Sequence, residues 1–122
     1  MALTDAQMQI YRAAAQQRQQ QKRDRLQQRQ QLGLGVAQQA SELLKREFGA
    51  EKVVLFGSMC SLAQIHDRSD VDLAVWGLNP RDYFRAVGQL LALHPDILVD
   101  LVEAETAPSR LLHEIETTGV IL

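Results

Sequence analysis

Hydrophobic and polar positions change their spacing along the chain, and each change predicts a new element of secondary structure. Residues 36–48 carry apolar side chains at helical spacing, which predicts a helix with one buried face. Residues 52–56 form a short apolar run with β-branched side chains, which predicts a strand. Gly33 and Gly35 stand before the helix and predict an interruption there, because glycine disfavours a helix interior.

The same alternation continues to the end of the chain. Four further elements are predicted: strands at residues 70–76 and 97–102, a helix at residues 79–93, and a last helix at residues 108–118. The expected buried positions are Phe84, Val87, Leu90 and Leu91 in the first of these helices and Leu111, Leu112 and Ile115 in the second. Helices and strands that alternate around a small sheet are typical of an α/β or α+β domain.

The first 31 residues differ in composition from the rest, because they are rich in glutamine and basic residues. Thr4 and Gln7 have the spacing of a capping box, and good helix formers follow, so a long helix is predicted from about Asp5 to Gln31. A helix that is polar nearly all round projects into solvent, pairs with a partner, or frays. We therefore divide the chain into a basic helical leader, residues 1–33, and a folded domain, residues 34–122.

Composition and charge disfavour several classes of protein for this chain. A chain of 122 residues that is 46% hydrophobic can form one core, and no apolar run is long enough to span a membrane. The net charge of −2 disfavours a protein that coats nucleic acid, although the leader carries roughly +4 and leaves nucleic-acid binding as a weaker alternative. The single cysteine, Cys60, cannot form an internal disulfide. These features predict a cytoplasmic protein with no membrane partner.

Candidate chemistry begins with Asp70 and Asp72, which are two positions apart in a strand and so face the same side of the sheet. Two like charges about 4 Å apart repel by roughly 4 kcal/mol at an effective dielectric constant of 20. Such a pair needs a raised pKa or a cation between its members. If the strand that contains Asp100 lies beside the first, three carboxylates converge, and grouped oxygen ligands of this kind suit Mg²⁺.

Gly57 and Ser58 follow the strand at residues 52–56 and are candidate phosphate ligands. Glycine lets the backbone approach a phosphate closely, and exposed N–H groups with a serine hydroxyl can hold phosphate oxygens. The order of strand, Gly-Ser, short helix, and strand with Asp-x-Asp places phosphate donors and metal ligands at the same end of two strands. This arrangement indicates metal-assisted nucleotidyl transfer.

The combination of Gly57-Ser58, Asp70-Val71-Asp72 and a later Asp100 resembles the polymerase-β-like nucleotidyltransferases. Within these, the segments LLKREFGAEKVVLFGS, SDVDLAVWG and ILVDLVE are most similar to minimal nucleotidyltransferases, the antitoxins of HEPN toxin–antitoxin pairs. The resemblance covers about residues 41–122 and implies a nucleotidyltransferase fold with a small mixed sheet flanked by helices. It also implies a HEPN ribonuclease partner, to which AMP is transferred from ATP onto a tyrosine.

The resemblance also implies roles for single residues. Asp70 and Asp72 would bind two Mg²⁺ ions, with Asp100 as third carboxylate and base for the attacking hydroxyl. Gly57 and Ser58 would lie at the triphosphate of ATP, and Arg68 and Ser69 are two further nucleotide-binding candidates.

The chain departs from the family pattern directly after Gly-Ser. The family commonly has an arginine, a small residue, a second arginine and a glycine there, whereas this chain has Met59, Cys60, Ser61 and Leu62. Arg68 or a residue of the partner is the candidate replacement for the lost cations. A catalytically inactive antitoxin that neutralises its toxin by binding alone therefore stays open as the main alternative.

Overall fold

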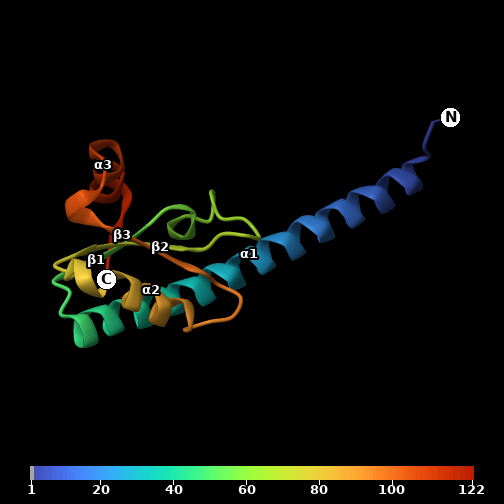
Figure 1. The fold of residues 1–122 in the computed structure, drawn as a ribbon. Coiled ribbons are helices and arrows are strands. Elements are labelled where there is room, and N and C mark those ends of the chain that lie inside the picture. The colour runs from blue at the N-terminus through green and yellow to red at the C-terminus, as the bar shows by residue number, and fades with distance from the viewer. Residues whose placement is uncertain (1) are drawn as a thin grey trace.

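A single long helix forms the N-terminal third of the protein in a computed structural model that describes residues 2–122. Helix α1 spans Asp5–Phe48. Thr4 caps its start with the predicted capping box to Gln7, and Gly49 ends it in a left-handed conformation with φ of 67°. The N-terminal half of α1 projects away from the rest of the molecule (Figure 1). The predicted leader helix is therefore present, and it is longer than expected.

The interruption predicted at Gly33 and Gly35 is wrong, because α1 continues through both glycines. Gly33 is buried, and a methyl group at its Cβ position would collide with the side chain of Met59. A packing contact thus outweighs the cost of about 1 kcal/mol that glycine brings to a helix interior. The boundary that we drew after residue 33 lies inside a continuous helix.

The sheet has four strands, and their order is β3-β2-β1-β4. The strands are β1 (Lys52–Phe56), β2 (Val71–Trp76), β3 (Val99–Glu103) and β4 (Val120–Ile121). β2 pairs with β1 in antiparallel and with β3 in parallel orientation, so the sheet is mixed, as the family resemblance implied. β4 was not predicted: the short apolar tail after Gly119 adds to the edge of β1 as a second antiparallel neighbour.

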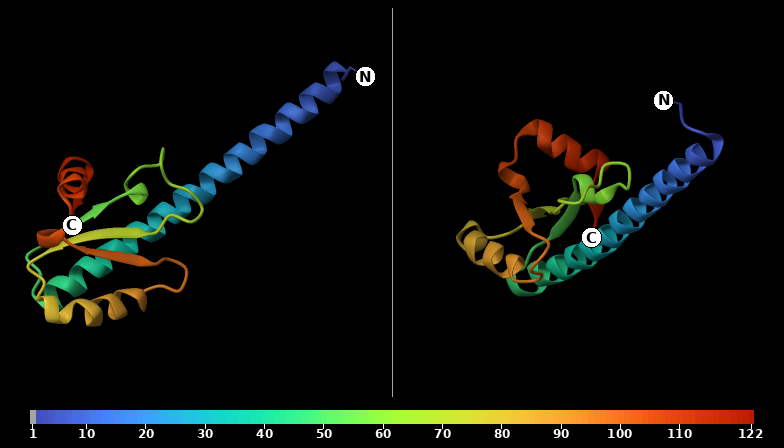
Figure 2. Two further views of the ribbon diagram at one scale, coloured as in Figure 1. Left: turned by 45° about the horizontal axis from the view of Figure 1, so that its top comes forward. Right: turned by 90° about the vertical axis from the view of Figure 1, so that its right-hand side faces the viewer.

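Helices cover both faces of the sheet. The C-terminal half of α1 and helix α2 (Tyr83–Leu91) lie on one face, and helix α3 (Ser109–Thr118) lies on the other (Figures 1 and 2). Three short 3₁₀ turns connect these elements at Ser58–Cys60, Pro80–Asp82 and Ala104–Thr106. The three-layer arrangement confirms the predicted mixed α/β architecture.

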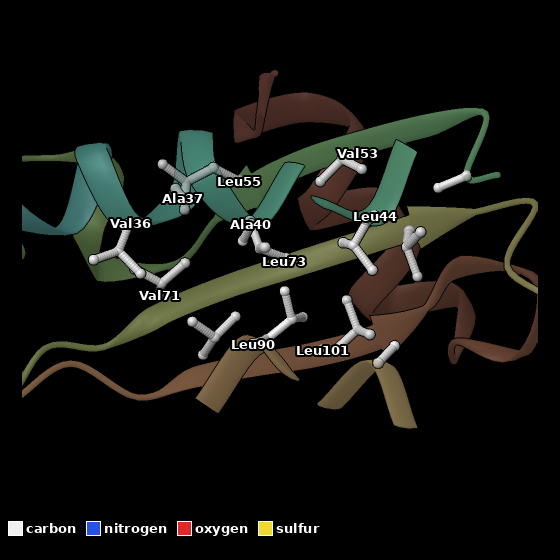
Figure 3. Packing of buried hydrophobic residues seen from close by; sticks show 14 of the residues in the cluster. Val36, Ala37, Ala40, Leu44, Val53, Leu55, Val71, Leu73, Leu90 and Leu101 are labelled. Atoms are coloured by element: carbon white, nitrogen blue, oxygen red, sulfur yellow. The ribbon is translucent and has the colours of Figure 1, made fainter. Parts of the chain in front are cut away.

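The main core lies between α1, α2 and one face of the sheet. Its side chains include Val36, Ala37, Ala40 and Leu44 of α1, Leu55 and Leu73 of the sheet, and Leu90 of α2 (Figure 3). A smaller cluster under α3 contains Ile115. Phe84, which we expected in the core, is 85% exposed. It lies on the solvent side of α2, whose buried residues are Ala86 and Leu90. Leu91 is exposed as well.

No helix among residues 2–122 has the length and apolar character needed to cross a membrane.

Candidate functional site

Two of the three candidate carboxylates are paired across neighbouring strands, and the third directly precedes one of these strands. Asp72 of β2 and Asp100 of β3 are direct partners in the parallel register. Asp70 directly precedes β2, and it lines the same hollow as Asp72 and Asp100. The face of β2 that carries Asp72 is covered in part by α3, since Ala74, two positions after Asp72, packs with Ile115. The condition on which the predicted convergence depended, that the two strands are neighbours, is therefore met.

Asp72 is the most strongly perturbed of these carboxyl groups. Burial raises its pKa from the ordinary 3.8 to about 6, and the negative charges of Asp100, Asp70 and Glu114 add to this effect. Glu114 belongs to α3, and nothing in the sequence pattern singled it out as part of the site. Asp72 therefore stands where negative charge is in excess, which is the electrostatic condition that a bound cation relieves.

Gly57 lies against Asp72 and has no space for a side chain. Its φ of 81° and ψ of −162° belong to a region that is essentially restricted to glycine. A Cβ atom at this position would touch Oδ2 of Asp72. The carboxylate is packed directly on bare backbone at the end of β1, so that a ligand of Asp72 would also meet the backbone of the Gly-Ser turn.

The two serine candidates form one hydrogen-bonded unit. Ser58 opens the 3₁₀ turn after β1, and its Oγ lies 2.8 Å from Oγ of Ser69. Ser69 is almost fully buried, and its Oγ also accepts a hydrogen bond of 2.9 Å from the backbone N–H of His66. The structure thus brings together Ser58 and Ser69, which are eleven positions apart, beside the first of the carboxylates.

Arg68, the fourth nucleotide-binding candidate, is exposed and lines a groove beside Asp70. The groove has a volume of about 690 Å³. Its charged lining residues are Arg25, Arg29, Asp67, Arg68, Asp70 and Asp96. Arg25 and Arg29 come from α1, and the sequence pattern assigned no role to either. Their spacing of four in a helix does place them on one face, which is the signal that could have found them.

A second hollow, of about 350 Å³, opens directly on the carboxylates. It is lined by Asp70, Asp72 and Asp100 together with apolar side chains, namely Val87, Leu91, Leu98 and Val99. Within residues 2–122, no three His, Cys, Asp or Glu side chains gather closely enough to form a ready-made metal site. Mg²⁺ tolerates such an arrangement, because it commonly keeps several waters and is held by one or two carboxylates with substrate phosphates. The donor set, all oxygen and carrying excess negative charge, fits Mg²⁺ held by Asp70 and Asp72.

The chain is similar in sequence and fold to known nucleotidyltransferases. Residues 38–122 match the family model described as polymerase beta, nucleotidyltransferase. A search among curated proteins gave no match. One solved structure, described as a minimal nucleotidyltransferase, shares the fold with a TM-score of 0.61, 24% identity, and coverage of 76% of this chain and 95% of that chain.

Two similar structures are toxin–antitoxin complexes. One, with AMP-PNP, is 27% identical with a TM-score of 0.56 and covers 68% of this chain and 69% of that chain. The other contains a tri-AMPylated Shewanella oneidensis HEPN toxin with an MNT antitoxin. It is 25% identical with a TM-score of 0.55 and covers 75% of this chain and 70% of that chain. Since the family model spans the whole sheet and every carboxylate on it, the chain belongs to the polymerase-β nucleotidyltransferase family.

Proposed function

We propose that this protein is an antitoxin nucleotidyltransferase that transfers AMP from ATP to a tyrosine hydroxyl of a partner HEPN ribonuclease toxin and thereby neutralises it. The observation that carries the proposal is the meeting of Asp70, Asp72 and Asp100 with the Gly57-Ser58 turn at one end of the sheet. The similar complexes with AMP-PNP and with an AMPylated HEPN toxin support the nucleotide and the partner.

Each residue has a role in this reaction. The oxygen of the acceptor hydroxyl attacks the α-phosphorus of ATP, the bond from this phosphorus to the bridging oxygen breaks, and pyrophosphate leaves. Asp100 is exposed beside Asp72 and is placed to accept the hydroxyl proton. The backbone of Gly57 and the hydroxyl of Ser58 hold phosphate oxygens. Mg²⁺, when bound by Asp70 and Asp72, would neutralise charge that develops on the phosphates.

The mixed apolar and acidic walls of the hollow suit a macromolecular acceptor. Two of its apolar lining side chains, Leu91 and Leu98, are 43% and 56% exposed. An apolar rim of this kind can contact an aromatic side chain whose hydroxyl reaches the polar interior. A partner protein that carries such an acceptor residue would form the opposite wall of the hollow.

One observation favours the rival proposal, an antitoxin that acts by binding alone. The turn after Ser58 carries no cation: Met59 is fully buried under Gly33, and Cys60 hydrogen-bonds through its thiol to the carbonyl of Leu55. The triphosphate would therefore meet fewer positive charges here than in the usual family pattern, and nucleotide affinity would be lower.

Label transfer decides between the two proposals. The complex with its partner is incubated with Mg²⁺ and ATP labelled at the α-phosphate, beside the Asp70→Asn/Asp72→Asn double variant. Catalysis predicts label on the partner with the natural sequence only, and toxicity that returns with the double variant. Absence of label from a stable complex, together with full protection by the double variant, would establish neutralisation by binding.

A further inference from the structure

Arg29 joins α1 to the segments that carry the site. Its side chain is only 20% exposed, which is low for an arginine on a helix surface. The Nε atom donates a hydrogen bond of 2.8 Å to the carbonyl of Ser69, and Nη2 donates one of 3.4 Å to the carbonyl of Asp96. A single guanidinium group thus connects α1, the loop before β2 and the loop before β3.

The same guanidinium acts on Asp70. Nη2 of Arg29 lies 3.6 Å from Oδ1 of Asp70, and this oxygen also accepts a hydrogen bond of 3.2 Å from the backbone N–H of Leu98. Oδ1 is therefore held from two sides, and the carboxylate plane is restricted. A carboxylate with one oxygen held in this way presents its second oxygen, Oδ2, in a defined direction.

Ser69 links Arg29 to the Gly-Ser turn of the site. Its carbonyl receives the hydrogen bond from Arg29, while its hydroxyl contacts the hydroxyl of Ser58 and the backbone of His66. A shift of the Ser69 backbone would move the Ser58 hydroxyl at the Gly-Ser turn. Arg29 consequently influences both the phosphate side and the carboxylate side of the site.

Neighbouring contacts show that α1 is built onto this loop. Gln30 donates a hydrogen bond of 3.1 Å from Nε2 to the carbonyl of Met59, and Leu26 packs against the main core. Arg25 also reaches the loop, but its ion pair with Asp67 is exposed, with side chains 57% and 56% accessible. Exposed ion pairs of this kind contribute little to stability, so Arg25 is a suitable control for Arg29.

We propose that Arg29 is a positioning residue for nucleotidyl transfer, and that the α1 segment 26–33 is a part of the active site although it precedes the family match at residue 38. This inference rests on the proposed function. Arg29 fixes the Ser69 loop and orients Asp70 without contacting substrate. It also provides a cation beside a site whose Gly-Ser turn has none.

The test compares Arg29→Ala, Arg29→Lys and Arg25→Ala in the full-length protein with its partner. Amide hydrogen exchange is measured over residues 57–70, and kcat and KM for ATP are measured separately, well below the melting temperature of each variant. Arg29→Ala should raise exchange in this loop and lower kcat by about 10- to 100-fold. Arg29→Lys should recover part of the loss, because an ammonium group can still donate to the Ser69 carbonyl. Arg25→Ala should change both readouts less than about two-fold.

Three results would overturn the proposal. Loop exchange in Arg29→Ala that equals the natural protein's would show that Arg29 does not hold the loop. Raised exchange with unchanged kcat would show a structural role only, and an equal loss in Arg25→Ala would show a general charge effect. If the natural protein transfers no nucleotide at all, the proposed function fails first. Binding of a fluorescent ATP analogue with Mg²⁺ then replaces kcat, and equal affinity in Arg29→Ala would contradict the positioning role.

Discussion

Asp72 lies directly opposite Asp100 across the parallel strands β2 and β3, and this pairing places two carboxylates side by side at a half-buried position. Burial, with added repulsion from Asp100, raises the pKa of Asp72 to about 6. The folded protein therefore holds this proton more tightly than the unfolded chain, in which the carboxyl has its ordinary value of 3.8. As the pH rises from about 4 to above 6, the native state loses stability.

Asp72→Asn should remove this penalty. At pH 7.5, without divalent cations, we expect the free energy of unfolding of the variant to be about 1 kcal/mol higher than that of the natural protein. This value allows for screening of the half-exposed group by water. Near pH 4 the gain should vanish, because the natural side chain is then protonated in the folded state. Urea unfolding at both pH values measures this. Asp24→Asn, on the exposed part of α1, is the control, and an Asp72→Asn variant that is less stable at pH 7.5 would refute the prediction.

Gly57→Ala should impair the site beyond its effect on stability. The backbone conformation of Gly57 costs other residues about 1–3 kcal/mol, and the added methyl group would push on Asp72. Gly49→Ala is a matched control, because Gly49 also has positive φ but nothing lies within 4 Å of its Cβ position. Both variants should lower the melting temperature.

Only Gly57→Ala should lose nucleotide transfer when both are assayed below their melting temperatures. Transfer by Gly57→Ala at the natural rate would mean that the close contact with Asp72 has no catalytic consequence.

Two neighbouring glycines of α1 should respond to alanine in opposite ways. Gly35 is exposed with free space around it, so Gly35→Ala should stabilise the helix by about 0.5–1 kcal/mol. Gly33 packs on Met59, so Gly33→Ala should destabilise the protein by about 1–3 kcal/mol through overpacking. Equilibrium unfolding in urea measures both changes. A stabilising effect of Gly33→Ala would show that Met59 moves aside at no cost.

Truncations should separate the two parts of α1. Deletion of residues 2–24 removes the projecting segment and should change the free energy of unfolding by less than about 0.5 kcal/mol. Deletion of residues 2–32 also removes Leu26, Arg29 and Gln30, which contact the core and the site loops, and should cost at least about 2 kcal/mol.

The shorter deletion should retain nucleotide transfer, and the longer one should lose it. Thermal unfolding and label transfer measure the two effects. Equal behaviour of the two truncated proteins would contradict a role of the α1 residues 26–32 in the site.

Local patterns were sufficient for most of the elements. The apolar run at residues 52–56 and the capping box at Thr4 lie where the sequence predicted, because strand preference and helix capping depend on neighbouring residues. The interruption at Gly33, the buried position assigned to Phe84 and the omission of β4 were errors of another kind. Each depends on which distant element lies beside the residue, and periodicity carries no such information.

The candidate site shows the same division. The sequence identified five candidates, namely Asp70, Asp72, Asp100, Gly57 and Ser58. Carboxylates and a Gly-Ser pair within or beside apolar strands contradict the local pattern and so indicate chemistry. The contributions of Glu114 and Arg29 became visible only in three dimensions. Their side chains reach the site from helices 42 positions after Asp72 and 41 before Asp70, respectively, across the folded sheet. The sequence by itself determined most of the elements and the candidate reactive groups, whereas the tertiary structure decided which charges surround those groups, because electrostatic and packing energies depend on distance in space.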